Sequence, residues 1–111
     1  MLVKIKGTDS SDLEANIDRV MNVACIAHRK GRLLRDRDLI DRRKGEYWYR
    51  DGNTFELYPS LNNDKAFVRH QGHHFVIVEF YSRYDSSGVK SNAISNLIVA
   101  LFPNDTELVE E

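Results

Sequence analysis

Residues 75–81 constrain the fold more than any other part of this chain. Their sequence is Phe-Val-Ile-Val-Glu-Phe-Tyr, so an extended strand through them would be apolar on both faces. β-Branched and aromatic residues favour strands, and a strand that is apolar on both faces is typical of the interior of a sheet. The sequence therefore predicts a sheet with residues 75–81 as a central strand.

An amphipathic segment near the beginning of the sequence can form a helix that packs on this sheet. Apolar residues between Leu13 and Ala27 recur every three or four positions, which places them on one side of a helix. Ser11 and Glu14 have the spacing of a capping box, in which each side chain accepts a hydrogen bond from a free N–H group. Gly31 suits the left-handed backbone that ends many helices. We expect this helix to span about residues 12–30.

A second amphipathic segment lies near the other end of the sequence. Positions 94, 97, 98, 101 and 102 form an apolar stripe at helical spacing, and Pro103 ends this helix because it cannot continue the hydrogen-bond ladder. A shorter helix is predicted over 33–44, where opposite charges three or four residues apart would support it. The residues expected in the core are Ile17, Val20, Trp48, Phe55, Val76, Val78, Leu97 and Leu101.

Turn signals place most of the remaining strands in two hairpins. Asp51-Gly52 is typical of a two-residue hairpin turn, and Gln71-Gly72 is a weaker form of the same signal. The order of elements predicts an α+β fold: an N-terminal and a C-terminal helix pack on an antiparallel sheet of about four or five strands, with the short basic helix between them. The expected strands are residues 2–5, 47–50, 53–58, 66–70 and 73–81.

Composition limits the class of protein. With 111 residues the chain is expected to form one domain, 1–111, and 41% hydrophobic and 30% charged residues are typical of a globular protein in water. No apolar run approaches the roughly 20 residues that span a bilayer, and Met1 begins a strand-like stretch rather than a signal peptide. The single cysteine, Cys25, excludes an intrachain disulfide and fits a reducing, cytoplasmic location. Residues 104–111 are expected to form an acidic tail.

Positive charge is concentrated between residues 29 and 44. This segment has eight Lys or Arg residues and three Asp residues, in a chain whose net charge is −1. Such a segment can bind the phosphates of RNA or DNA, although the interleaved aspartates also fit a solvated helix with many ion pairs. The candidate phosphate-binding residues are Arg29, Lys30, Arg32, Arg35, Arg37, Arg42, Arg43 and Lys44.

Tyrosines in the first hairpin form a second candidate surface. In the predicted register Trp48 lies opposite Phe55, on the face that we expect to be core. The other face then carries Tyr47, Tyr49 and Tyr58. Exposed tyrosines are typical of contacts with a partner and of base stacking, unless a helix covers this face as well.

Three of the four histidines lie in the second hairpin, at His70, His73 and His74. The predicted register places His70 opposite His73 and turns His74 to the other face. A zinc site needs three or four ligands, and no carboxylate in register supplies a third. We therefore expect no metal here.

Side chains suited to acid–base catalysis are present, but the predicted register separates them. Arg69 and His74 would lie on one face of the hairpin, whereas His73 and Glu79 would lie on the other. The sequence has no phosphate-binding loop, nucleophile elbow or zinc-protease motif, and Cys25 is expected in the core of the first helix. No catalytic residue and no cofactor is assigned, and enzymatic activity is disfavoured.

One side of the last helix carries almost no charge. Ser91 and Ser95, and likewise Asn92 and Asn96, lie four residues apart on the side opposite the predicted apolar stripe. Small polar side chains lose little entropy when they are covered. This side is therefore a candidate interface with a partner or with a second copy of the chain.

These observations favour a small non-enzymatic binding protein that acts on a macromolecular partner, with protein favoured over nucleic acid. Small size and the lack of cofactor motifs suit an inhibitor or accessory factor of a phage or mobile element. The alternative is an RNA- or DNA-binding module, or a small ribonuclease, that uses the basic segment 29–44 and the tyrosines. A steep loss of binding between about 50 and 200 mM salt would favour the alternative.

Overall fold

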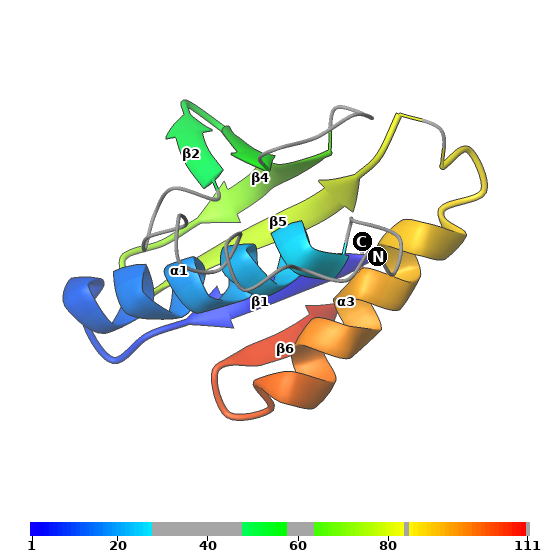
Figure 1. The fold of residues 1–111 in the computed structure, drawn as a ribbon. Helices are drawn as coiled ribbons and strands as arrows, with labels where there is room; N and C mark the ends of the chain where they lie inside the picture. The colour runs from blue at the N-terminus through cyan, green and yellow to red at the C-terminus, as the bar shows by residue number, and fades with distance from the viewer. Residues whose placement is uncertain (28–47, 58–63, 84, 111) are drawn as a thin grey trace, which may run out of the picture.

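An antiparallel sheet with two helices makes up the described part of the chain (Figure 1). This computed structural model describes residues 1–27, 48–57, 64–83 and 85–110, so the predicted helix over 33–44 lies outside the described residues. The elements are β1 (Leu2–Lys6), α1 (Ser10–Ala27), β2 (Trp48–Asp51), β3 (Thr54–Leu57), β4 (Lys65–Gln71), β5 (Phe75–Tyr81), α3 (Val89–Leu101) and β6 (Thr106–Val109).

The strands lie in the order β2-β3-β4-β5-β1-β6, and all neighbours are antiparallel. β5 lies between β4 and β1, which confirms the prediction of a central strand at residues 75–81. The fold is the predicted α+β arrangement, with a six-stranded sheet in place of four or five strands.

The additional strand is β6, which lies within the residues expected to form an acidic tail. It pairs with β1, so that Val3 lies opposite Leu108 and Ile5 lies opposite Thr106. The Thr106 hydroxyl donates a hydrogen bond to the carbonyl oxygen of Phe102 at 2.7 Å, which connects the start of β6 to the end of α3. The expectation of a tail over 104–111 was therefore wrong for residues 106–109.

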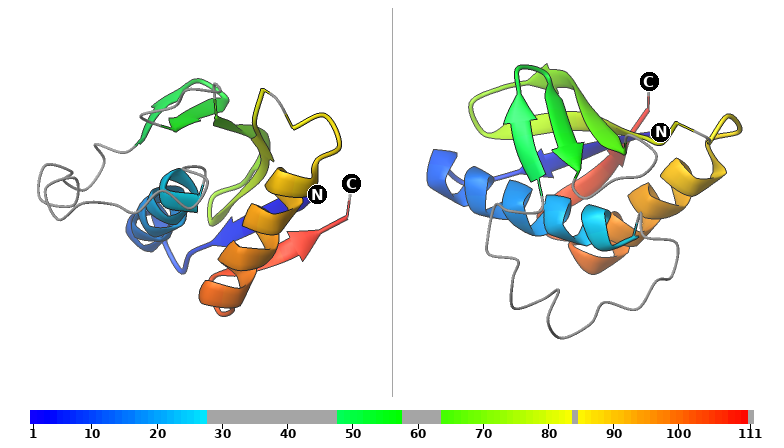
Figure 2. Two further views of the ribbon diagram at one scale, coloured as in Figure 1. Left: turned by 45° about the vertical axis from the view of Figure 1, so that its right-hand side comes forward. Right: turned by 45° about the horizontal axis from the view of Figure 1, so that its top comes forward.

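Both helices pack on the same face of the sheet (Figure 2). Side chains of a strand alternate between the two faces, and the alternate residues on the helix side are buried. The fully buried core comes from five of the strands and both helices, and it includes Val3, Ile5, Val20, Met21, Phe55, Val76, Val78 and Ile98.

The start of α1 uses reciprocal capping, but not by the predicted residues. The backbone N–H of Asp12 donates to Oδ1 of Asp9 at 2.8 Å, and the N–H of Thr8 donates to Oδ2 of Asp12 at 2.8 Å. Asp9 therefore caps the helix, and the predicted pair Ser11 and Glu14 lies inside it.

α3 buries a narrower side than its apolar stripe suggested. Ile94, Ser95 and Ile98 are buried, whereas Leu97 is 41% exposed and Leu101 is 53% exposed. The prediction that both leucines lie in the core was wrong, because α3 packs near the edge of the sheet on β6, β5 and β1. Of the other predicted core residues only Trp48 is half-buried; the rest are buried.

Both hairpins turn later than predicted. Asp51 pairs with Thr54, so the first turn consists of Gly52 and Asn53, and Gly52 has a φ of 59° that favours glycine. As a result Trp48 lies opposite Leu57 and not opposite Phe55.

In the second hairpin Gln71 pairs with Val76, and Gly72 N donates to Phe75 O at 3.0 Å. The turn residues are therefore His73 and His74. The register also shifts between Val68 and His70, which places a β-bulge at residue 69.

Candidate functional site

The sheet face opposite α1 and α3 carries no helix in the part of the chain that the structure describes (Figure 2). We call it the open face. Its side chains are the outward residues of each strand, and most are half-buried by their neighbours. Its apolar and aromatic members are Leu2, Tyr49, Phe67, Phe75, Ile77, Tyr81 and Val109.

Two aromatic rings pack against each other on β4 and β5, the two middle strands of this face. The ring centroids of Phe67 and Tyr81 are 5.5 Å apart with an interplanar angle of 59°. Tyr81 is 40% exposed, so its ring and hydroxyl are accessible to a partner. The guanidinium carbon of Arg69 lies 5.2 Å from the Phe67 ring centroid, within the range of a cation–π contact.

The four cations that β1 and β4 place on the open face all lie beside carboxylates. Ion pairs at the solvent-accessible surface contribute little stability, but they neutralise the face. The pairs are Lys65 Nζ with Glu56 Oε1 at 3.2 Å, Arg69 Nε with Glu79 Oε1 at 2.9 Å, Lys4 Nζ with Glu107 Oε1 at 3.8 Å and Lys6 Nζ with Glu107 Oε2 at 4.0 Å.

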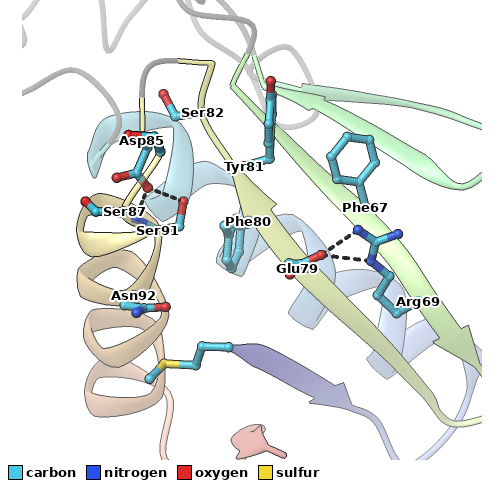
Figure 3. Close-up of a pocket in the computed structure, with 13 residues that line it drawn as sticks. Phe67, Arg69, Glu79, Phe80, Tyr81, Ser82, Asp85, Ser87, Ser91 and Asn92 are labelled. Atoms are coloured by element: carbon cyan, nitrogen blue, oxygen red, sulfur yellow. Dashed lines mark hydrogen bonds and ion pairs between the residues drawn. The ribbon is translucent and has the colours of Figure 1, made fainter. Parts of the chain in front are cut away.

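A hollow of about 290 Å³ lies between the aromatic rings and the first turn of α3 (Figure 3). Phe67, Arg69 and Glu79 line it from the sheet, and Ser87 and Asn92 line it from the helix side. Sites for small molecules typically have volumes of about 300–1,000 Å³. The hollow lies just below that range, so it suits a side chain of a partner better than a cofactor.

Asp85 organises the helix side of the hollow (Figure 3). Its carboxylate accepts hydrogen bonds from the Ser91 hydroxyl at 2.7 Å, the Ser91 N–H at 2.8 Å and the Lys90 N–H at 3.1 Å. Partial desolvation tends to raise the pKa of Asp85, but these hydrogen bonds and the charge of Lys90 outweigh it and lower the pKa below 3.8. Asp85 therefore satisfies two of the N–H groups at the start of α3, those of Lys90 and Ser91.

We expect Asp85→Ala to lower the free energy of unfolding by about 1 kcal/mol at pH 7, because the helix loses a cap. The lowered pKa means that the folded protein holds the carboxylate more strongly than the unfolded chain does. This stabilisation is present above the unfolded pKa of about 4 and is lost as the pH falls through the lower folded pKa, so the difference from wild type should shrink as the solution is made more acidic. Urea unfolding of wild type and variant at pH 7 and at acidic pH measures the difference in the free energy of unfolding. Asp51→Ala, which removes an exposed carboxylate, is the control, and an unchanged difference for Asp85→Ala at low pH would contradict this role.

A larger groove of about 610 Å³ lies between α1 and the β2–β3 hairpin, and three of the residues that line it, Asp18, Trp48 and Arg50, are engaged in hydrogen bonds. The Trp48 indole N–H donates to Asp18 Oδ1 at 3.0 Å, and Asn22 Nδ2 donates to Asp18 Oδ2 at 3.4 Å. Arg50 donates to the carbonyl oxygen of Gly52 and to the side chain of Gln71. We therefore assign these contacts to the attachment of the hairpin to α1.

The structure describes some of the predicted binding residues. Tyr49 lies on the open face and is 57% exposed. Ser91 and Asn92 line the hollow and Asn96 is exposed, whereas Ser95 is buried and its hydroxyl donates to the Ser91 carbonyl oxygen at 3.0 Å. The expectation that Ser95 lies outward was therefore wrong. Outside the described residues lie Arg29, Lys30, Arg32, Arg35, Arg37, Arg42, Arg43, Lys44, Tyr47 and Tyr58.

The later turn of the second hairpin changes the predicted histidine and catalytic groupings. His70 lies opposite Ile77 and not opposite His73. The bulge brings Arg69 and Glu79 together on the open face, although they were expected on opposite faces. Within the described residues, no three His, Cys, Asp or Glu side chains gather closely enough to hold a metal ion.

Sequence reasoning missed Phe67 and Tyr81 as surface residues. Their segments were identified as strands, but an apolar strand does not indicate which of its faces is covered. None of the helices in the described ranges is long and apolar enough to cross a membrane. Comparisons with protein-family models, with curated proteins and with solved structures found no match.

Proposed function

We propose that this protein is a non-enzymatic binding protein that contacts another protein through the open face. The observation that carries the proposal is the pair Phe67 and Tyr81 beside the hollow, on a sheet face with no described helix over it. Accessible aromatic side chains beside a small pocket are typical of the residues that dominate protein interfaces. The hollow would receive a side chain of the partner.

The charges of the open face favour a protein partner over a nucleic acid. Affinity for nucleic acid comes largely from cations that neutralise phosphates. Here Lys65 and Arg69 lie beside Glu56 and Glu79, so a phosphate would have to displace a carboxylate that is already in place. A protein surface of mixed polarity can replace these solvent-accessible pairs with ion pairs and hydrogen bonds of its own.

RNA or DNA binding is the second candidate, and one observation supports it. Aromatic side chains on an open antiparallel sheet can stack on unpaired bases, and Arg69 over Phe67 would add a cation to such a platform. The basic segment 29–44 would have to supply the phosphate contacts, and these remain a prediction from the sequence.

The ionisable groups around the hollow support binding rather than catalysis. Arg69 is engaged with Glu79, and Asp85 accepts hydrogen bonds from the first turn of α3. A general base needs a free lone pair directed at the substrate. A cytoplasmic inhibitor or accessory factor of a phage or mobile element would be a binding protein of this kind.

The test uses Tyr81→Ser and immobilised full-length protein. Wild type should retain a protein from an extract of its native cells, and Tyr81→Ser should weaken the affinity for that protein at least tenfold, as expected for an interface hot spot. Leu101→Ser is the matched control, because Leu101 is exposed but lies on the helix side of the sheet. Surface plasmon resonance with the purified partner gives the affinities.

Two outcomes would overturn the proposal. Equal affinity of wild type and Tyr81→Ser would place the contact elsewhere. Retention of RNA or DNA, sensitive to nuclease and lost steeply between about 50 and 200 mM salt, would establish the second candidate instead.

A further inference from the structure

β6 forms one edge of the sheet, and its backbone offers a hydrogen-bonding site there. Lys6 N donates to Asp105 O at 2.8 Å, and in an antiparallel pair the residues that bond to the neighbouring strand alternate with those that do not. Leu108, three residues after Asp105, therefore directs its N–H and C=O away from β1. Thr106 has the same orientation, but its N–H already donates to Phe102 O at 3.0 Å.

The side chain of Leu108 is accessible as well. It lies opposite Val3, which is buried on the helix side, so Leu108 points to that side and is 42% exposed. An edge strand with an outward backbone pair and an exposed leucine is a template for a further strand.

α3 packs against β6 at this edge of the sheet (Figure 1). Lys90 Nζ lies 3.8 Å from Asp64 Oδ1, beside β4, so that side of the helix points toward the interior of the sheet. With 3.6 residues per turn, Asn92, Asn96 and Val99 lie on the opposite side of α3. This side, which faces the β6 edge, carries no ionisable residue.

We propose that the β6 edge is the interface of a homodimer, in which β6 pairs antiparallel with β6 of a second copy and α3 packs beside α3. A symmetric pair uses the same surface twice, so that surface has to be self-complementary. The uncharged side of α3 meets this condition because two copies of it bring no like charges together.

The charges on β6 select the register. A two-fold axis perpendicular to the sheet keeps all helices on one face and places one residue of β6 opposite its own copy. If that residue were Glu107, two carboxylates would face each other, which is destabilising. If that residue is Leu108, the two leucines face each other and Glu107 of each copy faces Val109 of the other. The Leu108 N–H of each copy then donates to the Leu108 carbonyl oxygen of the other.

The two copies of α3 can pack side by side in this dimer because the side chains that face each other are small. Helices pack at about 8–10 Å between axes, and the distance depends on the side chains at the contact. Asparagine and valine allow an approach near the lower end of that range. The dimer would join two six-stranded sheets into one and keep both open faces on the same side.

Analytical ultracentrifugation of the full chain tests the dimer. At about 50 μM, well above a micromolar dissociation constant, wild type should sediment with twice the 12.9 kDa mass of one chain. Asn96→Lys should raise the dissociation constant at least tenfold, because it places two ammonium groups across the axis. Leu97→Lys is the matched control: it introduces the same charge at the next residue of α3, on the side away from the edge, and should leave the dimer intact.

Hydrogen exchange tests the register. Leu108 N–H should exchange slowly in the wild-type dimer and rapidly in Asn96→Lys, whereas the Val109 N–H, which bonds within the chain, should stay protected in both. A monomeric wild type at 50 μM, rapid exchange of Leu108, or equal disruption by Leu97→Lys would overturn the proposal.

Discussion

Ile98→Ala should lower the free energy of unfolding by about 2–5 kcal/mol, whereas Leu97→Ala should lower it by less than about 1 kcal/mol. Ile98 is fully buried between α3 and the sheet, so its truncation leaves a cavity that the surrounding side chains cannot fill. Leu97 is 41% exposed, so less apolar surface leaves water when the chain folds.

Urea unfolding followed by the fluorescence of the single tryptophan, Trp48, measures both changes. The two variants change neighbouring residues of one helix, so helix propensity affects them similarly, and the difference reports the orientation of α3. A larger loss for Leu97→Ala than for Ile98→Ala would mean that the helix buries its other side, as its apolar stripe had suggested.

Gly7→Ala should lower the free energy of unfolding by about 3 kcal/mol, a large value for an added methyl group. Gly7 connects β1 to α1, and a Cβ there would lie 2.6 Å from the Cα of Leu13 and would also clash with its backbone nitrogen. To relieve this clash, the backbone at Gly7 or at Leu13 would have to shift. Gly7 N is held by a 2.9 Å hydrogen bond to His74 O, and Leu13 is held within the first turns of α1.

Gly52→Ala is the control for this variant. Gly52 has a φ of 59°, but no atom lies within 4 Å of its added Cβ, so the change costs only backbone strain of about 1 kcal/mol. Thermal unfolding of both variants separates steric contact from strain. A loss at Gly7 no larger than at Gly52 would show that α1 can move away from β1.

Those parts of the fold that depend on local pattern could be predicted from the sequence. The run at 75–81 identified β5, because few other structures accommodate seven residues that are apolar on both faces. The periodicity from Leu13 to Ala27 identified α1, although it did not distinguish Asp9 from Ser11 as the cap. Two acceptable caps lie two residues apart, and the periodicity of the apolar residues fits a helix that begins after either of them.

Features that depend on contacts between distant segments could not be predicted. β6 is short and contains Glu107, so it becomes a strand only because β1 offers an edge. The bulge at Arg69 has no local signal, and it alone brings Arg69 and Glu79 to the same face. The bulge also changes which face of β4 carries Phe67, so the Phe67–Tyr81 pair was not found, whereas Tyr49 lies on the outward face that the sequence predicted.

The position of β1 between β5 and β6 has a consequence for the kinetics of folding. Val3 pairs with Val78 on one side and with Leu108 on the other, so β1 pairs only with strands that lie far away along the chain. Closing loops of this size, on the order of 100 residues, costs chain entropy before any contact is gained, and folding slows as such pairings increase. The strands β2 to β5 are neighbours both in the sequence and in the sheet, so they can pair with one another before β1 is added. We therefore expect the N-terminal strand to join the sheet late, and the chain to be most prone to aggregation before it does.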